Sequence, residues 1–112
     1  MESHRPIIFH IPHSSLVIPL EVRRQIFLSD AQLDEELRLM TDHFTDELFD
    51  FQFDESKRIV YPVSRLVVDP ERFLDDEAEP MSSVGMGVIY TQTSAGETLR
   101  DAPCKSLRDD LL

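Results

Sequence analysis

Short apolar runs bounded by proline and polar residues predict four β-strands in this chain. The first run is Ile7–Ile11, and the following Pro12 ends it because proline has no backbone N–H to give to a neighbouring strand. Similar runs over residues 59–61, 63–68 and 88–91 predict the other three strands. Each run is long enough for a strand and too short for a helix of ordinary length.

The clearest helical pattern begins after Ser29. Ser29 and Gln32 have the spacing of a capping box, in which each side chain accepts a hydrogen bond from the other residue's backbone N–H. Apolar residues then recur every three or four positions and form one stripe, through Leu33, Leu37, Met40, Phe44 and Leu48. Shorter or weaker helices are predicted over residues 20–27, after Pro19, and over residues 98–112.

The acidic residues within this helical pattern leave one question open. Asp42 and Asp46 are four residues apart and lie nearly opposite the apolar stripe, so on one straight helix they would face solvent. A break near Thr41–Asp42, where both residues are good N-caps, would free Asp42 to reach a site. The sequence alone is compatible with both arrangements.

Composition and charge narrow the class of protein. The 112 residues fit a single domain over residues 1–112, with 41% hydrophobic and 29% charged residues. A formal net charge of −11 argues against nucleic acids and anionic membrane surfaces as partners, since both require basic patches. No apolar run has the length of a membrane span, and the single cysteine, Cys104, cannot form an internal disulfide. We therefore expect a cytoplasmic protein.

A first cluster of candidate chemistry directly follows the first strand. Its residues are His13, Ser14 and Ser15. Open α/β sheets bind ligands beyond the carboxyl ends of their strands, so an imidazole and two hydroxyl groups there have the position of a site. Taken alone, however, this run favours an ordinary turn in which Ser15 caps a short segment.

A second cluster consists of two arginines and an aspartate around the end of the predicted strand over residues 63–68. Arg65 lies inside the apolar run and needs a partner, which Asp69 can supply, and Arg72 follows three residues later. Because guanidinium groups bind carboxylates through paired N–H groups, this arrangement suits an anion. A structural Arg–Asp bridge that fixes a loop explains the spacing equally well.

Five separated segments together resemble the N-terminal part of the N-formylglutamate amidohydrolase (N-formylglutamate deformylase) family. In chain order they are HIPHSS at 10–15, MTD at 40–42 with TDELF at 45–49, VSRLVVDPERF at 63–73, EPM at 79–81 and GMGVIYT at 85–91. Each segment is a weak signal alone, but five in this order and spacing are specific, and they span most of residues 6–100.

The resemblance implies an α/β fold with a mixed β-sheet and flanking helices, similar to the zinc carboxypeptidases. It also implies hydrolysis of N-formyl-L-glutamate, or of a related N-acyl amino acid, to the amino acid and formate. The substrate is then a small dicarboxylate, the reaction ends a histidine-degradation route, and a divalent metal, expected to be zinc, is the cofactor.

The family's functional residues carry over onto matching positions of this chain. His13 corresponds to a metal ligand and Asp42 is the candidate for a second one, with Glu47 less favoured and His43 a further possibility. The substrate-binding candidates are Arg65, Arg72 and Ser14. General chemistry agrees in outline, because catalytic zinc sites take histidine and carboxylate ligands and keep one position for water.

The chain departs from the family in its length. Family members are much longer and carry a further histidine region, whereas here no histidine follows His43. His10 points along the first strand and is expected to be packed rather than to bind a metal. We therefore expect a fragment or a truncated relative that does not turn over substrate alone.

Two alternatives to the enzyme follow from this departure. The first is a non-catalytic relative that binds a small dicarboxylate or a partner chain. Its incomplete sheet would expose apolar surface and favour homo-oligomers. The second is an acidic interaction domain whose resemblance to the family is only structural.

Overall fold

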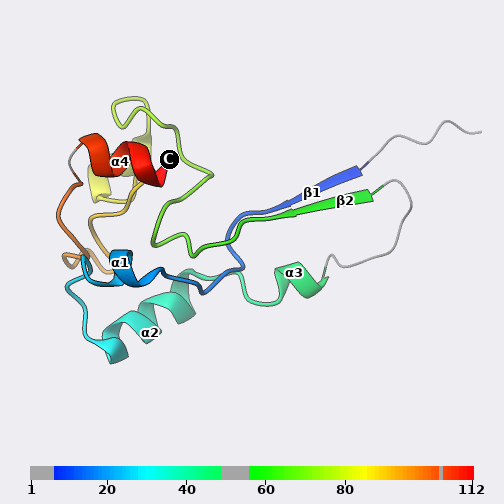
Figure 1. Ribbon diagram of the computed structural model, residues 1–112, viewed down its shortest axis with the longest axis horizontal. Coiled ribbons are helices and arrows are strands. Elements are labelled where there is room, and N and C mark those ends of the chain that lie inside the picture. The colour runs from blue at the N-terminus through cyan, green and yellow to red at the C-terminus, as the bar shows by residue number, and fades with distance from the viewer. Residues whose placement is uncertain (1–6, 49–55, 104) are drawn as a thin grey trace, which may run out of the picture.

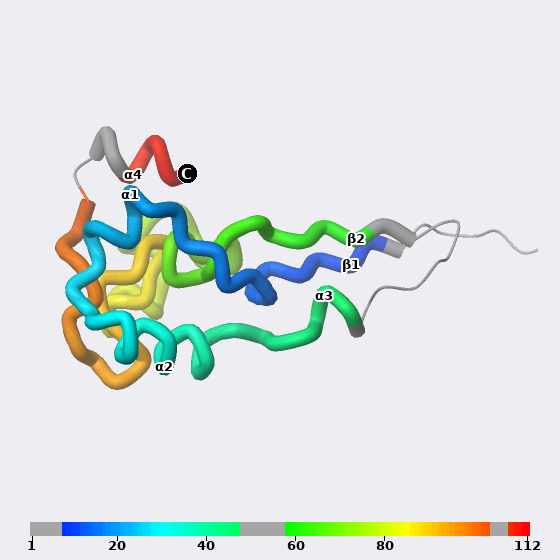
Figure 2. Tube along the Cα trace, turned by 60° about the horizontal axis from the view of Figure 1, so that its bottom comes forward, coloured from blue at the N-terminus to red at the C-terminus, as the bar shows by residue number. Residues whose placement is uncertain are grey.

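The computed structural model describes residues 7–48, 56–103 and 105–112 (Figure 1). It divides into two regions. The ribbon consists of β1 (Ile7–Ile11) and β2 (Ser56–Val60), and the body consists of residues 12–41, 61–103 and 105–112. The ribbon extends away from the body in both views, and the short helix α3 (Thr45–Leu48) lies beside it (Figure 2).

The two strands of the ribbon pair in parallel. Their register runs from Ile7 opposite Ser56 to Ile11 opposite Val60. Both strands run toward the body, so their carboxyl ends meet it (Figure 1). β1 has the predicted bounds, whereas β2 begins earlier and ends one residue earlier than the predicted strand over 59–61. The α/β class is confirmed, and the sheet that the described residues form has two strands.

The first helix, α1 (Leu20–Arg23), is shorter than the predicted helix over residues 20–27. After Arg23 the chain turns, and the Arg23 guanidinium group donates hydrogen bonds to the carbonyls of Ile26 (3.3 Å) and Leu28 (3.0 Å). The Phe27 N–H then donates to the carbonyl of Leu99 at 2.8 Å. Pairing with a distant segment therefore replaces the last helical turn.

The second helix, α2 (Asp30–Met40), begins with the predicted capping box between Ser29 and Gln32. It ends at Thr41, whose extended backbone (ψ 135°) turns the chain away from the helical path. Phe44 then has a φ of 65° and precedes α3. The break near Thr41–Asp42 is therefore the arrangement found, and a single straight helix through this region is excluded.

The predicted strands over residues 63–68 and 88–91 are wrong, because both segments are buried without regular pairing. Ser64 forms a local turn, since its carbonyl accepts from the Val67 N–H (2.9 Å) and its hydroxyl oxygen accepts from the Leu66 N–H (3.1 Å). The Arg100 guanidinium group donates to the carbonyls of Val67 (2.7 Å) and Tyr90 (2.9 Å). A side chain thus takes the carbonyls that a strand ladder would use.

The remaining helices lie late in the chain. The 3₁₀ helix η1 (Pro80–Val84) is capped by the Glu79 carboxylate and ends at Gly85, which has a φ of 72°. The last helix, α4 (Lys105–Leu111), occupies only the second half of the predicted helix over residues 98–112. No helix in the described ranges is both long and apolar enough to cross a membrane.

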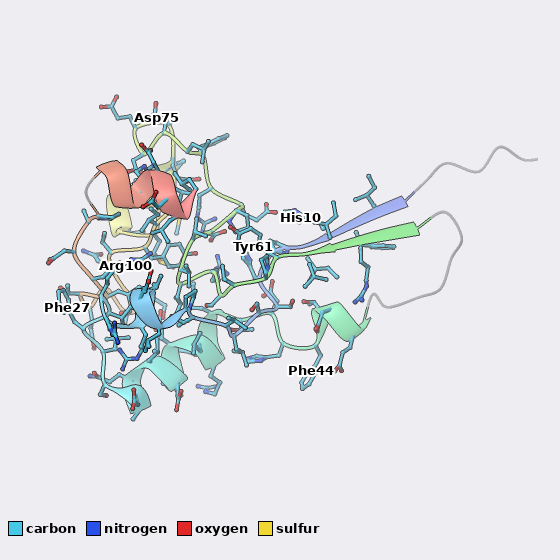
Figure 3. The ribbon with its side chains drawn as sticks, viewed as in Figure 1. His10, Phe27, Phe44, Tyr61, Asp75 and Arg100 are labelled. Carbon is cyan, nitrogen blue, oxygen red and sulfur yellow. The ribbon has the colours of Figure 1, made fainter. Side chains whose placement is uncertain are left out.

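The hydrophobic core lies mainly in the body, and Ile11, the last residue of β1, is also buried at 3% exposed. It combines residues of α1, of α2 and of the turn between them with residues in or near the two irregular buried segments and with one residue before Arg100. They are Val22, Ile26, Leu28, Leu33, Leu66, Val67, Val68, Met86, Val88, Ile89, Tyr90 and Leu99. The ribbon instead leaves Ile8 and Ile59 exposed. His10 and Tyr61 mark the junction of the two regions, and Arg100 lies within the body (Figure 3).

Candidate functional site

A buried carboxylate, Asp69, is the centre of the candidate site, and its side chain is 0% exposed. It directly follows the irregular segment 63–68, and its carboxylate contacts His13, two residues past the end of β1. Its backbone N–H donates to the carbonyl of Val88 at 2.7 Å, which fixes the residue to the second irregular segment. The carboxylate of Asp69 is therefore held by the best-packed part of the body.

Hydrogen-bond donors surround both oxygens of this carboxylate. Oδ1 accepts from His13 Nε2 (2.7 Å) and from the Glu71 N–H (3.0 Å). Oδ2 accepts from the Tyr90 hydroxyl group and from Arg65 Nη2 (3.1 Å). Burial acts to raise the pKa of Asp69, but the hydrogen bonds from His13, Tyr90 and Glu71 outweigh it and hold that pKa well below its usual range. Asp69 is therefore ionised at neutral pH.

The two predicted anion-binding arginines both approach Asp69. Arg65 Nε also donates to the Tyr90 hydroxyl at 2.9 Å, and its guanidinium carbon lies 5.8 Å from the centre of the Tyr90 ring. Arg72 Nε donates to the carbonyl of Met86 (3.0 Å) and lies 3.8 Å from Asp69 Oδ2. The structural bridge that the spacing allowed is thus present. Two guanidinium groups around one carboxylate nevertheless leave one unit of positive charge.

His13 and Asp42 lie next to each other on the exposed side of Asp69. His13 Nδ1 is 3.7 Å from Asp42 Oδ2, and the Asp42 N–H donates to the carbonyl of His13 at 2.8 Å. A separation of 3.7 Å is too long for a good hydrogen bond. It is close to the spacing of two ligand atoms that each lie ~2.1 Å from a tetrahedral zinc ion, roughly 3.4 Å.

The donor set of this pair also suits zinc, which prefers imidazole nitrogen and carboxylate oxygen. Within the described residues no group of three or more histidine, cysteine, aspartate or glutamate side chains could hold a metal ion. The pair therefore offers two ligands, and a bound metal would need further ligands from water, substrate or residues outside the described ranges.

Comparison with known protein families shows to which family this chain belongs. The sequence model of the N-formylglutamate amidohydrolase family matches residues 5–110. This chain belongs to that family. The match covers nearly the whole chain, including both candidate ligands and both arginines. Neither the curated proteins nor the solved structures gave a match, so the likeness to zinc carboxypeptidases stays an expectation.

Other residues that the family resemblance singled out lie apart from the His13–Asp42 pair or at its edge. Ser14 is half-buried beside His13. Glu47 is exposed on α3, and His43 is exposed and pairs through Nε2 with the carbonyl of Arg38 at 3.1 Å. The packed position expected for His10 is wrong. Its ring is 45% exposed and its Nδ1 lies 3.1 Å from a Glu71 carboxylate oxygen.

Sequence reasoning missed two residues of this family member's site region. Tyr90 is fully buried, and burial together with the Asp69 hydrogen bond raises its pKa to about 12. Arg100 is 2% exposed, and burial lowers its pKa to about 10. A tyrosine at the end of an otherwise apolar run was the available signal for Tyr90. Nothing in the local pattern distinguishes Arg100 from a surface arginine.

Proposed function

We propose that this protein is a metal-dependent amidohydrolase that releases formate from N-formyl-L-glutamate. The observation that carries the proposal is the spacing of His13 and Asp42 beside two partly free guanidinium groups. Membership of the N-formylglutamate amidohydrolase family supports the amide-hydrolysing chemistry. The proposal includes a cytoplasmic location, which the single cysteine favours, and a place at the end of histidine degradation, which the family resemblance implies.

His13 and Asp42 are the residues that would hold the metal, expected to be zinc. Once bound, zinc supplies a Lewis acid for the formyl carbonyl and lowers the pKa of a bound water molecule. In the hydrolysis that we propose, water gives its oxygen to the formyl carbon, the C–N bond breaks and the amino nitrogen takes up a proton. Ser14, half-buried next to His13, is the candidate for a hydrogen bond to the substrate.

The two arginines would bind the carboxylates of the substrate. Within the described residues, Arg72 makes its contacts through Nε, and Arg65 makes its contacts through Nε and Nη2. The Nη groups of Arg72 and the Nη1 group of Arg65 are therefore available to an anion. Both side chains are mostly buried, with 15% and 18% exposed for Arg65 and Arg72, so each keeps only an edge at the surface. Such pre-ordered clamps hold a small dicarboxylate in one orientation.

The proposal is tested by measuring formate release from N-formyl-L-glutamate by the zinc-loaded protein. The length of the chain predicted no turnover by it alone, whereas the site that we propose requires turnover, so this measurement decides between the two. The proposal expects release by the unaltered protein, about 100-fold less with His13→Ala because the metal loses a ligand, and a raised KM with Arg72→Ala because Arg72 binds substrate. His43→Ala is the matched control, since that ring pairs with Arg38 away from the site, and it should retain release. A folded, zinc-loaded protein that releases no formate would overturn the proposal.

A further inference from the structure

We propose that Asp69 is a positioning residue, which Tyr90 supports, and that it holds His13 in the tautomer that carries its proton on Nε2 and directs a free Nδ1 lone pair at Asp42. The role of this lone pair in metal binding rests on the proposed function. The tautomer itself does not, since it follows from contacts within the chain.

The first step is that Asp69 has no freedom to turn. Each of its oxygens accepts two hydrogen bonds, and the donors come from four different residues. The backbone of Asp69 is fixed through the carbonyl of Val88 at 2.7 Å. A carboxylate with 0% exposure and donors on both sides has one orientation, and Oδ1 therefore stays directed at the His13 ring.

The second step concerns the proton between the two residues. The Glu71 N–H and Arg65 Nη2 can only donate, and they donate to Oδ1 (3.0 Å) and Oδ2 (3.1 Å), so both oxygens of Asp69 act as acceptors. His13 Nε2, at 2.7 Å from Oδ1, therefore carries the proton. In a neutral imidazole the other nitrogen is then an acceptor with a free lone pair. That nitrogen, Nδ1, is the one that faces Asp42 Oδ2 at 3.7 Å. The hydrogen bond from Nε2 to Asp69 thus determines that Nδ1 is a hydrogen-bond acceptor.

The third step is that Tyr90 belongs to the same chain of contacts. Its hydroxyl group donates to Asp69 Oδ2 and accepts from Arg65 Nε at 2.9 Å. Tyr90 is 0% exposed, so it cannot touch a substrate and acts through Asp69 and Arg65. Carboxylates behind metal-binding histidines set ring orientation, and their loss typically lowers metal affinity by about 10–100-fold.

The chain contains a natural contrast in His10 and Glu71. This pair has a similar distance, 3.1 Å between Nδ1 and Oε1, but both side chains are 45% exposed. Solvent competes for each group there, so the Glu71 carboxylate cannot hold one tautomer of His10. The competing interpretation for His13 is a doubly protonated ring between two carboxylates, which is a purely structural ion pair.

The test is ¹⁵N NMR of the histidine rings in the metal-free protein at about pH 8.5, above the ordinary range of an imidazole. We expect His13 as the single Nε2–H tautomer and His10 as a mixture of tautomers. Asp69→Asn should abolish the preference at His13 and lower zinc affinity 10–100-fold, as measured by calorimetry. Tyr90→Phe should lower the affinity less than Asp69→Asn does. Glu71→Gln, the matched control, should change neither quantity at His13.

The possible failures are distinguishable. A His13 ring protonated on Nδ1 or on both nitrogens in the unaltered protein would overturn the proposal, even if Asp69→Asn did not fold. Unchanged zinc affinity in a folded Asp69→Asn, with affinity lost in His13→Ala, would also overturn it while leaving the proposed metal site intact. The expected tautomer without any zinc binding would instead refute the proposed function and leave the positioning role standing.

Discussion

The body and the ribbon hold their apolar side chains in opposite ways. In the body, Leu66 and Tyr90 are 0% exposed and pack into one core, whereas in the ribbon Ile8 is 61% and Ile59 is 54% exposed. A two-stranded sheet has little independent stability in water, because it buries few side chains. The ribbon is therefore expected to gain its order from backbone pairing and from its attachment to the body.

The two histidines at the end of β1 show the same contrast over three residues. His10, in the ribbon, shares an exposed ion pair with Glu71, while His13, in the body, contacts a fully buried Asp69. This difference between the two histidines shows that residues of the body, rather than of the ribbon, fix the geometry of the candidate site. The ribbon delivers His13 to that position but does not hold its ring.

The largest expected effect is the loss of a core side chain. Leu66→Ala should lower the free energy of unfolding by about 2–5 kcal/mol, because it removes buried methyl groups and leaves a cavity. Urea unfolding followed by circular dichroism measures this. Ile59→Ala in the ribbon is the matched variant and should cost less than about 1 kcal/mol, since its side chain is half-exposed. Equal losses would mean that the ribbon shares the core's stability.

A second effect should appear at high pH. Burial and the Asp69 hydrogen bond raise the pKa of Tyr90 to about 12. Because the value in the unfolded chain is about 10, the stabilisation is complete below about pH 10 and is lost as the pH rises toward the folded value. The contribution of Tyr90 to the free energy of unfolding should therefore fall by about 1–3 kcal/mol over that range. It is read as the difference from Tyr90→Phe, because the buried Arg100, whose pKa is lowered to about 10, acts in the opposite direction in both proteins.

Tyr90→Phe should lack this decrease, and urea unfolding at several pH values for both proteins measures the difference. Tyr61→Phe, at the junction with the ribbon, leaves the buried phenol of Tyr90 in place. This variant should behave like the unaltered protein. A decrease that persisted in Tyr90→Phe would show that another group of the body causes it.

A smaller effect is expected at the start of α2, on the surface of the body. Ser29→Ala removes the hydroxyl oxygen that accepts from the Gln32 N–H at 3.2 Å. It should lower the free energy of unfolding by about 1 kcal/mol, the usual value of an N-cap. Ser83→Ala is the control, since its hydroxyl group donates only to the exposed carbonyl of Pro80. Thermal unfolding that ranked the two variants in the opposite order would contradict the role of the cap.

The smallest effect on stability should come from Ile59→Lys, which should change the free energy of unfolding by less than about 0.5 kcal/mol. Its effect on assembly should be clear. The sequence predicts homo-oligomers through exposed sheet surface, and the exposed side chains of the ribbon support that prediction. Light scattering after size exclusion should show oligomers of the unaltered protein and a monomer for Ile59→Lys. Leu20 on the body is 65% exposed against 54% for Ile59, and Leu20→Lys should still form oligomers. A monomeric unaltered protein would refute the prediction.

The sequence predicted the elements whose signals are local. The bounds of β1, the capping box at Ser29 and one of the two alternatives at Thr41 all depend on residues within a few positions of each other. The segments over 63–68 and 88–91 were predicted wrongly because an apolar run shows burial, not backbone pairing. Their carbonyls are satisfied by Arg100, a residue whose contacts lie ten or more positions away.

The candidate site was predictable to the same extent. Sequence spacing placed Arg65 and Arg72 around Asp69 and placed His13 after the end of the first strand. The family resemblance then gave His13 and Asp42 the role of metal ligands. The structure brings all five residues to one place. It also makes Asp69 the centre of the contacts. Spacing could not show this, because the hydrogen bond from His13 joins residues 56 positions apart.

The hydrogen bond between the peptide groups of His13 and Asp42 has a dynamic consequence. It ties the end of β1 to the chain that leaves α2, so a displacement of either segment carries the other with it. The gap between the two side chains should therefore fluctuate less than the position of either one. Slow hydrogen exchange at the Asp42 amide, relative to the exposed amides around it, would report that coupled motion.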